Sequence, residues 1–250
     1  MMQSDKLRGS VSRFLLLNAL SRVQIANLLT KLASPSGASV SYVTDIWLPK
    51  DLRQSREVRI ECEKGFLKAG ESEALKAWWL VNRRGANTPN WDIASACMIN
   101  GAKGLILVEA KAHDKGFSPK GKHKPATPNG QENHKRIGGA IQQANDGLNK
   151  VVPGWSLSRD THYQLCNRFA WAWKLASLGI PTILIYLGFL NATEMSHQGQ
   201  PFTNAADWEC CIRSHAKGIV PEYAWERKLD IGGTPLWFLV RTLELSFDLP

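Results

Sequence analysis

Two apolar runs in the middle of the chain carry three polar residues whose types and spacing could do chemistry. Asp92 stands at the start of the first run, and Glu109 and Lys111 stand near the end of the second. Two carboxylates on one sheet face suit a hard divalent cation, and a lysine beside them suits the orientation or deprotonation of an attacking water. The chemistry that this set predicts is metal-assisted hydrolysis of a phosphodiester.

The turn between the two runs decides whether these residues meet. If Asn100 and Gly101 form a two-residue hairpin turn, Asp92 lies directly across from Glu109. A four-residue turn places Asp92 across from Glu109 or Lys111, whereas an odd-length turn separates them unless a bulge restores the register. With an even turn all three side chains share one face, because cross-strand partners point the same way.

The predicted ligands of a Mg²⁺ (or Mn²⁺) ion are the Asp92 and Glu109 carboxylates and the backbone carbonyl of Ala110. Lys111 would act on the attacking water or stabilise the transition state. The alternative is a surface hairpin with an ordinary ion pair. The second run disfavours that alternative, since it is apolar on both sides and reads as a central strand, where unpaired charges are expensive to bury.

Two predicted helices flank the hairpin in the sequence. Residues 61–82 read as a helix, and Glu71 lies on its apolar stripe. Glu71 is either a third metal ligand and catalytic residue, or a helix-capping residue or ion-pair partner of Lys68 or Lys76. Residues 160–178 read as a second helix, followed by a buried strand at 180–189. The polar face of this second helix offers second-tier candidates. They either contact the scissile phosphate or the metal-bound water, or form hydrogen bonds with neighbouring loops: Gln164, Asn167 and Arg168.

A basic segment follows the hairpin. His113 is a further second-tier candidate, and residues 111–136 read mostly as a loop because of their prolines and glycines. The loop either holds a phosphate backbone or is simply a solvated charged segment. An amphipathic helix follows from Ile137 to about Asn149. The candidate nucleic-acid-binding residues are Lys115, Lys120, Lys122, Lys124, Lys135 and Arg136.

Composition limits the class of protein. The chain has 250 residues, 44% of them hydrophobic, and a net charge of +9. The charge favours a polyanionic partner, with DNA preferred to RNA. Five cysteines without a Cys-x-x-Cys pair argue against structural zinc and a disulfide framework, so a cytoplasmic location fits best. No apolar run is long enough to cross a membrane. Double-strand cutting with one site per chain would need a homodimer.

The predicted organisation is an N-terminal amphipathic helix and linker (1–44) followed by a single domain (45–250). The linker is the Ser-, Pro- and Gly-rich stretch at 34–39. Near the C-terminus we expect a helix at 207–216 and a strand at 236–240. Trp208, Trp225 and Trp237 either stack bases or fill a small extra core, and we favour the core.

These residues resemble a known family. Asp92 and the Glu109-Ala110-Lys111 triplet, in the order helix, hairpin, helix, strand, look like the PD-(D/E)xK nuclease superfamily. The segments G-E-S-E-A-L-K-A-W-W-L, W-D-I-A-S-A-C, L-V-E-A-K-A-H and Y-Q-L-C-N-R-F-A are similar to a group of uncharacterised bacterial members. The resemblance covers roughly residues 60–190, and the sequence departs from the family in having Trp91, not proline, before the aspartate.

The resemblance implies a restriction-endonuclease-like α/β fold, a mixed central sheet flanked by helices, with extra N- and C-terminal elements. It also implies metal ligation by Asp92 and Glu109, a catalytic Lys111 and support from Glu71. The expected function is a Mg²⁺- or Mn²⁺-dependent endonuclease acting on DNA. The superfamily includes members without nuclease activity, so the alternative is an inactive nucleic-acid-binding or protein-interaction module on the same fold.

Overall fold

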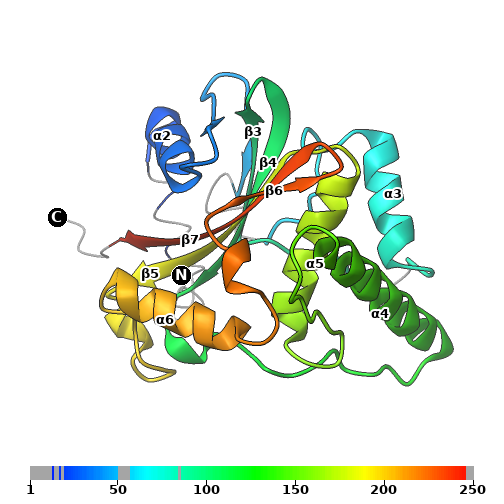
Figure 1. Ribbon diagram of the computed structural model, residues 1–250. Coiled ribbons are helices and arrows are strands. Elements are labelled where there is room, and N and C mark those ends of the chain that lie inside the picture. The colour runs from blue at the N-terminus through cyan, green and yellow to red at the C-terminus, as the bar shows by residue number, and fades with distance from the viewer. Residues whose placement is uncertain (1–12, 14–16, 18–19, 50–56, 84–85, 246–250) are drawn as a thin grey trace, which may run out of the picture.

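A mixed β-sheet forms the centre of the protein (Figure 1). The computed structural model describes residues 13, 17, 20–49, 57–83 and 86–245. The strand order is β1-β3-β4-β5-β7-β6, and β2 also pairs with β3. The strands are β1 (Ala38–Ser39), β2 (Trp47–Leu48), β3 (Ile93–Ile99), β4 (Ala102–Lys111), β5 (Thr182–Leu190), β6 (Lys228–Ile231) and β7 (Thr234–Glu244).

The sheet is antiparallel at its two sides and parallel in its middle. β3 and β4 form an antiparallel hairpin, β4, β5 and β7 run parallel to one another, and β6 returns antiparallel to β7. The α/β class with a mixed sheet is therefore confirmed. The parallel middle requires long crossovers, which the helices between β4 and β5 supply.

The hairpin turn has the predicted length. Asn100 and Gly101 have φ values of 50° and 81°, and a two-residue type I′ turn requires positive φ at both positions. The pairing runs from Ile99 opposite Ala102 back to Ile93 opposite Val108. The predicted register is confirmed, and it places Asp92 one residue beyond the last regular pair.

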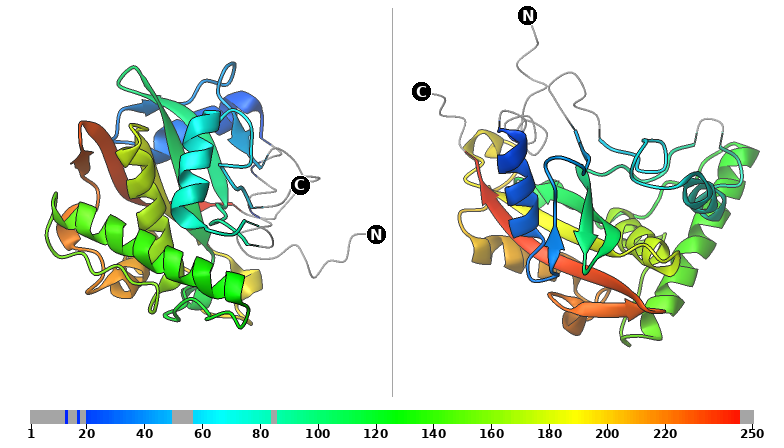
Figure 2. Two further views of the ribbon diagram at one scale, coloured as in Figure 1. Left: turned by 90° about the vertical axis from the view of Figure 1, so that its right-hand side faces the viewer. Right: turned by 90° about the horizontal axis from the view of Figure 1, so that it is seen from above.

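Helices cover the two faces of the sheet unequally (Figure 2). Residues of α3 to α6 contribute to the core on one face, and α2 packs on the other. In the described part of the chain, no helix is long and apolar enough to cross a bilayer. The helices are α2 (Arg22–Leu32), α3 (Ala69–Trp79), α4 (Pro128–Asn149), α5 (Tyr163–Ser177) and α6 (Ala205–Ala216).

β4 is buried on both sides, as its apolar sequence predicts. Leu105 and Leu107 belong to the core under α3 to α6, and Ile106 and Val108 belong to the core under α2. Glu109 follows the alternation of Leu105 and Leu107, so it points toward α5. This alternation brings a carboxylate into the larger core.

The N-terminal segment is part of the same sheet. Ser21 caps α2 through a reciprocal contact with Gln24, and the apolar side of α2 packs on the sheet. The stretch predicted as a linker contains β1, in which Ala38 pairs with Ile99 of β3. The predicted linker at 34–39 is therefore not free of the domain, because its last two residues pair with β3. The predicted N-terminal helix begins within residues 1–19, and most of these lie outside the described residues.

Two predicted helices have different limits. α3 starts at Ala69, not near 61, because the preceding segment contains Gly65 at a φ of 96°. α4 starts at Pro128, so the region predicted as loop up to 136 ends in nine helical residues. Thr127 caps this helix by accepting from the N–H of Gly130, and proline favours the first helical position, where its missing N–H is not needed.

The C-terminal elements follow the prediction closely. The helix and the strand expected there are α6 and β7, whereas β6 was not predicted. Trp208 and Trp225 are buried, and both belong to the main core and not to a separate small one. Trp237 is partly buried and packs against the core on the α2 side.

Candidate active site

Asp92 ties the start of β3 to the end of β4. Its N–H donates to the carbonyl of Val108 at 3.1 Å, and its Oδ2 accepts from the N–H of Ala110 at 2.7 Å. The aspartate therefore brackets Glu109, the residue between these two partners. The Asp92 side chain accepts the hydrogen bond that a backbone carbonyl would accept if the ladder continued. This holds the Asp92 carboxylate at the predicted position.

The Glu109 carboxylate is buried and fully bonded. Lys111 Nζ donates to Oε1 at 2.5 Å, and Gln164 Nε2 donates to the same oxygen at 2.8 Å. Arg168 Nε donates to Oε2 at 2.7 Å. The side chain is only 3% exposed, and a buried carboxylate is tolerated when charged donors satisfy its oxygens in this way.

The two carboxylates titrate in opposite directions. Burial, and next the charge of Glu109, raises the pKa of Asp92 to about 7. Burial also opposes ionisation of Glu109, but Arg168 and Lys111 together hold the pKa of Glu109 below its ordinary value. Glu109 thus keeps its charge, while Asp92 exchanges a proton near neutral pH.

The position of Lys111 is set by the turn that follows β4. A side chain at position 116 would meet the Lys111 stem, since a Cβ there lies 2.8 Å from the lysine Cδ, so Gly116 leaves room for it. The Lys111 ammonium lies 5.6 Å from the centre of the Phe117 ring. Only 11% of the lysine side chain is exposed, so the ammonium is confined beside Glu109.

α5 supplies the donors on the other side of Glu109. Gln164 and Arg168 are four residues apart, so both point from one face of the helix. Asn167 accepts from Arg168 Nη1 at 2.7 Å, and the guanidinium lies 4.9 Å from the centre of the Trp91 ring. Gln164 and Arg168 bind the site carboxylate directly, whereas Asn167 reaches it only through Arg168, and neither sequence-based interpretation of these residues had foreseen this. Trp91 supports Arg168 by packing against its guanidinium.

Glu71 does not join this group. Its Oε2 accepts from the backbone N–H of Lys68 at 2.7 Å, and its other oxygen lies 3.8 Å from Lys68 Nζ. The structure shows the capping interpretation. The prediction that Glu71 is a third metal ligand was wrong. A glutamate at the third helical position reaches back to the free N–H before the helix, whatever its place on the apolar stripe.

Two residues near the site were missed by the sequence analysis. Val58 and Trp91 form an antiparallel bridge, which sets Glu57 beside Asp92, and the Glu57 charge contributes to raising the pKa of Asp92. Tyr186 of β5 pairs with Glu109 of β4, and its buried hydroxyl has no hydrogen-bond partner among the described residues. A single bridge leaves no periodic pattern, whereas the tyrosine was visible as the polar member of an apolar run.

The donor set suits a small hard cation. Asp92 Oδ1 accepts no hydrogen bond from the described residues, and the neighbouring carboxylate raises the cost of ionising Asp92, which a divalent cation would offset. Mg²⁺ takes one or two carboxylates and fills its other positions with water or phosphate oxygens. Within the described ranges, no three His, Cys, Asp or Glu side chains gather into a metal-binding group.

The other predicted residues lie around this site or farther along the chain. His113 pairs with Pro201 just beyond β4, and burial lowers its pKa. Lys122 is half-buried with its ammonium 4.7 Å from the centre of the Tyr163 ring, and burial lowers its pKa too. The exposed cations are Lys115, Lys120 and Lys124 in the segment after β4, and Lys135 and Arg136 on α4.

Trp91 and Arg168 also show how the site and the core share residues. Trp91 is completely buried, and it belongs to the core that α3 to α6 cover. The site therefore lies at the edge of this core, where packed neighbours hold its geometry.

Comparisons of this chain with protein-family models, with curated proteins and with solved structures found no match.

Proposed function

We propose that this protein is a metal-dependent nuclease, built on a restriction-endonuclease-like core, that hydrolyses phosphodiester bonds in DNA. The observation that carries the proposal is the hydrogen bond from the Ala110 N–H to the Asp92 carboxylate. This bond joins Asp92 to the middle residue of the Glu109-Ala110-Lys111 triplet. It fixes two carboxylates and one ammonium at one edge of the sheet, the combination that metal-assisted phosphodiester hydrolysis needs.

Each residue then has a role. Asp92, Glu109 and the Ala110 carbonyl would hold Mg²⁺ or Mn²⁺, which supplies acidification of a water and neutralisation of charge on the phosphate. Lys111 donates from Nζ and would orient the attacking water or stabilise the charge that develops on the phosphate oxygens.

The α5 donors have a supporting role. Gln164 donates to Oε1 of Glu109, which Lys111 also binds, and Arg168 donates to Oε2, so both oxygens of the carboxylate are held in one orientation. Arg168 would also offset the negative charge of Glu109 when Lys111 turns toward the substrate. We therefore assign Gln164 and Arg168 as positioning residues.

The preference for DNA rests on charge. The chain carries 31 Lys and Arg against 22 Asp and Glu, and exposed lysines follow the strand that carries the site. Binding to a phosphate backbone releases condensed counterions, so affinity should fall steeply with salt.

A cleavage assay tests the proposal. Plasmid DNA, linear duplex, single-stranded DNA and RNA are incubated with the protein in Mg²⁺, Mn²⁺ or EDTA. We expect metal-dependent cutting that Lys111→Met abolishes, because methionine keeps the stem that lies beside Gly116 and removes the charge. Lys103→Met is the matched control, since Lys103 is exposed at the other end of β4. No cutting of any substrate, or full activity in Lys111→Met, would overturn the proposal.

The alternative, an inactive nucleic-acid-binding or protein-interaction module, is separated by the same preparations. Such a module would leave every substrate intact. Salt-sensitive DNA binding that is equal in EDTA and Mg²⁺ would identify it as a nucleic-acid-binding module. The buried Arg168–Glu109 pair is compatible with either, because it balances charge in the absence of a metal.

A further inference from the structure

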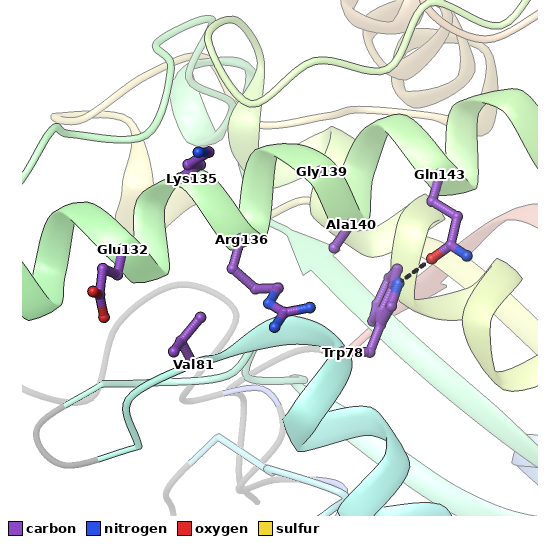
Figure 3. Close-up of a pocket in the computed structure, with 8 residues that line it drawn as sticks. All are labelled: Trp78, Val81, Glu132, Lys135, Arg136, Gly139, Ala140 and Gln143. Atoms are coloured by element: carbon purple, nitrogen blue, oxygen red, sulfur yellow. Dashed lines mark hydrogen bonds between the residues drawn. The ribbon is translucent and has the colours of Figure 1, made fainter.

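A groove of about 540 Å³ lies between α3 and α4, away from the residues of the candidate active site (Figure 3). We propose that it binds an unpaired nucleobase of a single-stranded nucleic acid, with the adjoining phosphate held by basic residues of α4. The proposal rests on the proposed function for the kind of polymer, but it does not require that the protein cut it. A groove of this size has room for one nucleotide.

Trp78 provides the stacking surface. It is the partly buried member of a tryptophan cluster, with ring centres 5.4 Å from Trp79, 6.5 Å from Trp171 and 6.4 Å from Trp173. Its Nε1 donates to Gln143 Oε1 at 2.6 Å, which fixes the plane of the ring. A ring held in place loses little entropy when a base stacks on it, and every base has a face that can stack.

Arg136 provides the charge. It is exposed, and it makes no hydrogen bond or ion pair with the residues that the structure describes. In Figure 3 its side chain extends from α4 across the groove toward the α3 side and Trp78, whereas Lys135 points away from α3. A guanidinium in this position can stack on the free face of a base or bind its phosphate in bidentate fashion.

The remaining groups fit a nucleotide better than an acidic peptide or a purely apolar ligand. Glu132, the acid in the groove, is engaged by Asn82 Nδ2 at 2.7 Å. The Gln143 side-chain oxygen is bound to Trp78, and its N–H donors have no acceptor among the residues that the structure describes. Lys174 adds a positive charge 5.6 Å from the centre of the Trp78 ring. An aromatic floor, a planar cation and a free amide are the groups that bind single strands.

Gly139 gives a way to test the groove without removing a contact. It lines the groove, and a Cβ built there meets nothing within 4 Å. Gly139→Leu should therefore fill the groove, and it replaces a helical glycine by a better helix former. Gly70→Leu is the matched control, because Gly70 is also helical, exposed and open, but lies outside the groove.

The experiment measures fluorescence anisotropy of a labelled oligothymidylate, an abasic oligonucleotide of equal phosphate number and a duplex, in EDTA so that no cleavage occurs. We expect the native protein to bind the oligothymidylate about tenfold more tightly than the abasic chain. Gly139→Leu should remove that preference. Arg136→Ala should weaken binding of both single strands, because each keeps the phosphate that the guanidinium holds, and Gly70→Leu and Lys150→Ala should change neither the preference nor the affinity. Lys150 is an exposed cation just after α4 and outside the groove.

Equal affinity of the native protein for the two single strands, or a preference that survives in Gly139→Leu, would overturn the proposal. Binding of an acidic peptide that Gly139→Leu abolishes, without any base preference, would overturn it in favour of a protein partner. Failure here and failure of the nuclease proposal are distinguishable, because Gly139→Leu leaves Lys111 in place. If the protein cuts DNA but shows no base preference, only the proposal for the groove is wrong. If it prefers the oligothymidylate but cuts nothing, only the nuclease proposal is wrong.

Discussion

Arg168 Nε lies 2.7 Å from Oε2 of Glu109, and both side chains are almost fully buried. The pair joins α5 to β4, with Trp91 against the guanidinium. It holds the site carboxylate in place, and it also balances a charge that the core would otherwise not tolerate. Stability and geometry of the site therefore depend on the same contact.

Removing one partner of this pair should destabilise the protein strongly. Arg168→Ala leaves Glu109 buried with less compensation, and we expect a loss of about 3–5 kcal/mol in the free energy of unfolding. Urea denaturation measures it. Arg159→Ala removes an arginine whose ion-pair partner Asp160 is exposed, and should change stability by less than about 1 kcal/mol. Equal losses in both variants would show that the buried pair has no special role.

The double variant Glu109→Gln, Arg168→Met separates charge from packing. If the large loss comes from an unpaired buried charge, removing both charges should restore part of the stability that Arg168→Ala loses. Losses that simply add would contradict this account.

Divalent cations should stabilise the protein more at high pH than at low pH. Asp92 has a pKa raised to about 7, so protons compete with the cation below that pH and release the carboxylate above it. We expect Mn²⁺ to raise the melting temperature more near pH 8 than near pH 6, by roughly 2–4 °C for each kcal/mol of binding. Differential scanning fluorimetry measures the shift. Asp92→Asn should abolish it, and an equal shift in Asp92→Asn would place the cation elsewhere.

Glu57 and Glu71 should behave differently. Glu71→Gln weakens the cap of α3 and should lower stability by no more than about 1 kcal/mol, with no effect on the site. Glu57→Gln removes a like charge beside Asp92 and should lower the pKa of Asp92. Carbon NMR titration of the Asp92 carboxyl measures its pKa in the two variants, and urea denaturation measures the stability of Glu71→Gln. A lowered pKa in Glu71→Gln, together with none in Glu57→Gln, would restore Glu71 as the acid of the site.

His215 should make the protein lose stability in mild acid. Its ring stacks 4.5 Å from Phe117 and lies 4.8 Å from His162, and burial, followed by the charges of His162 and Lys111, lowers its pKa from 6.5 to about 4. The unfolded chain takes up this proton first as the pH falls, so the stabilisation present above about 6.5 is lost progressively toward 4.

His215→Phe keeps the stacking and removes the titration. The drop in melting temperature between pH 7.5 and pH 4.5 should be a few degrees smaller in this variant than in the native protein. The effect is small because the ring is partly exposed. His123→Gln, at an exposed position, is the control and should not change the difference. Identical acid dependence in His215→Phe and the native protein would contradict the assignment.

Local patterns were enough to predict the hairpin and its register. Asn100-Gly101 selects a two-residue turn, and the alternation of Leu105, Ile106, Leu107 and Val108 assigns the faces of β4. The start of α4 was missed, since Pro128 was taken to indicate loop although proline also begins helices. The end of the preceding loop depends on the cap at Thr127, which periodicity does not detect.

The sequence by itself determined which residues could share a sheet face, because strand alternation and turn length are local properties. Asp92, Glu109 and Lys111 are related by a single hairpin, so counting was sufficient to bring them together. Only the tertiary structure decided which distant groups complete the site. Arg168 reaches Glu109 through the packing of α5, and Glu57 is brought beside Asp92 by an isolated bridge. Glu71 turns to its own helix end, because an unpaired backbone N–H lies within reach.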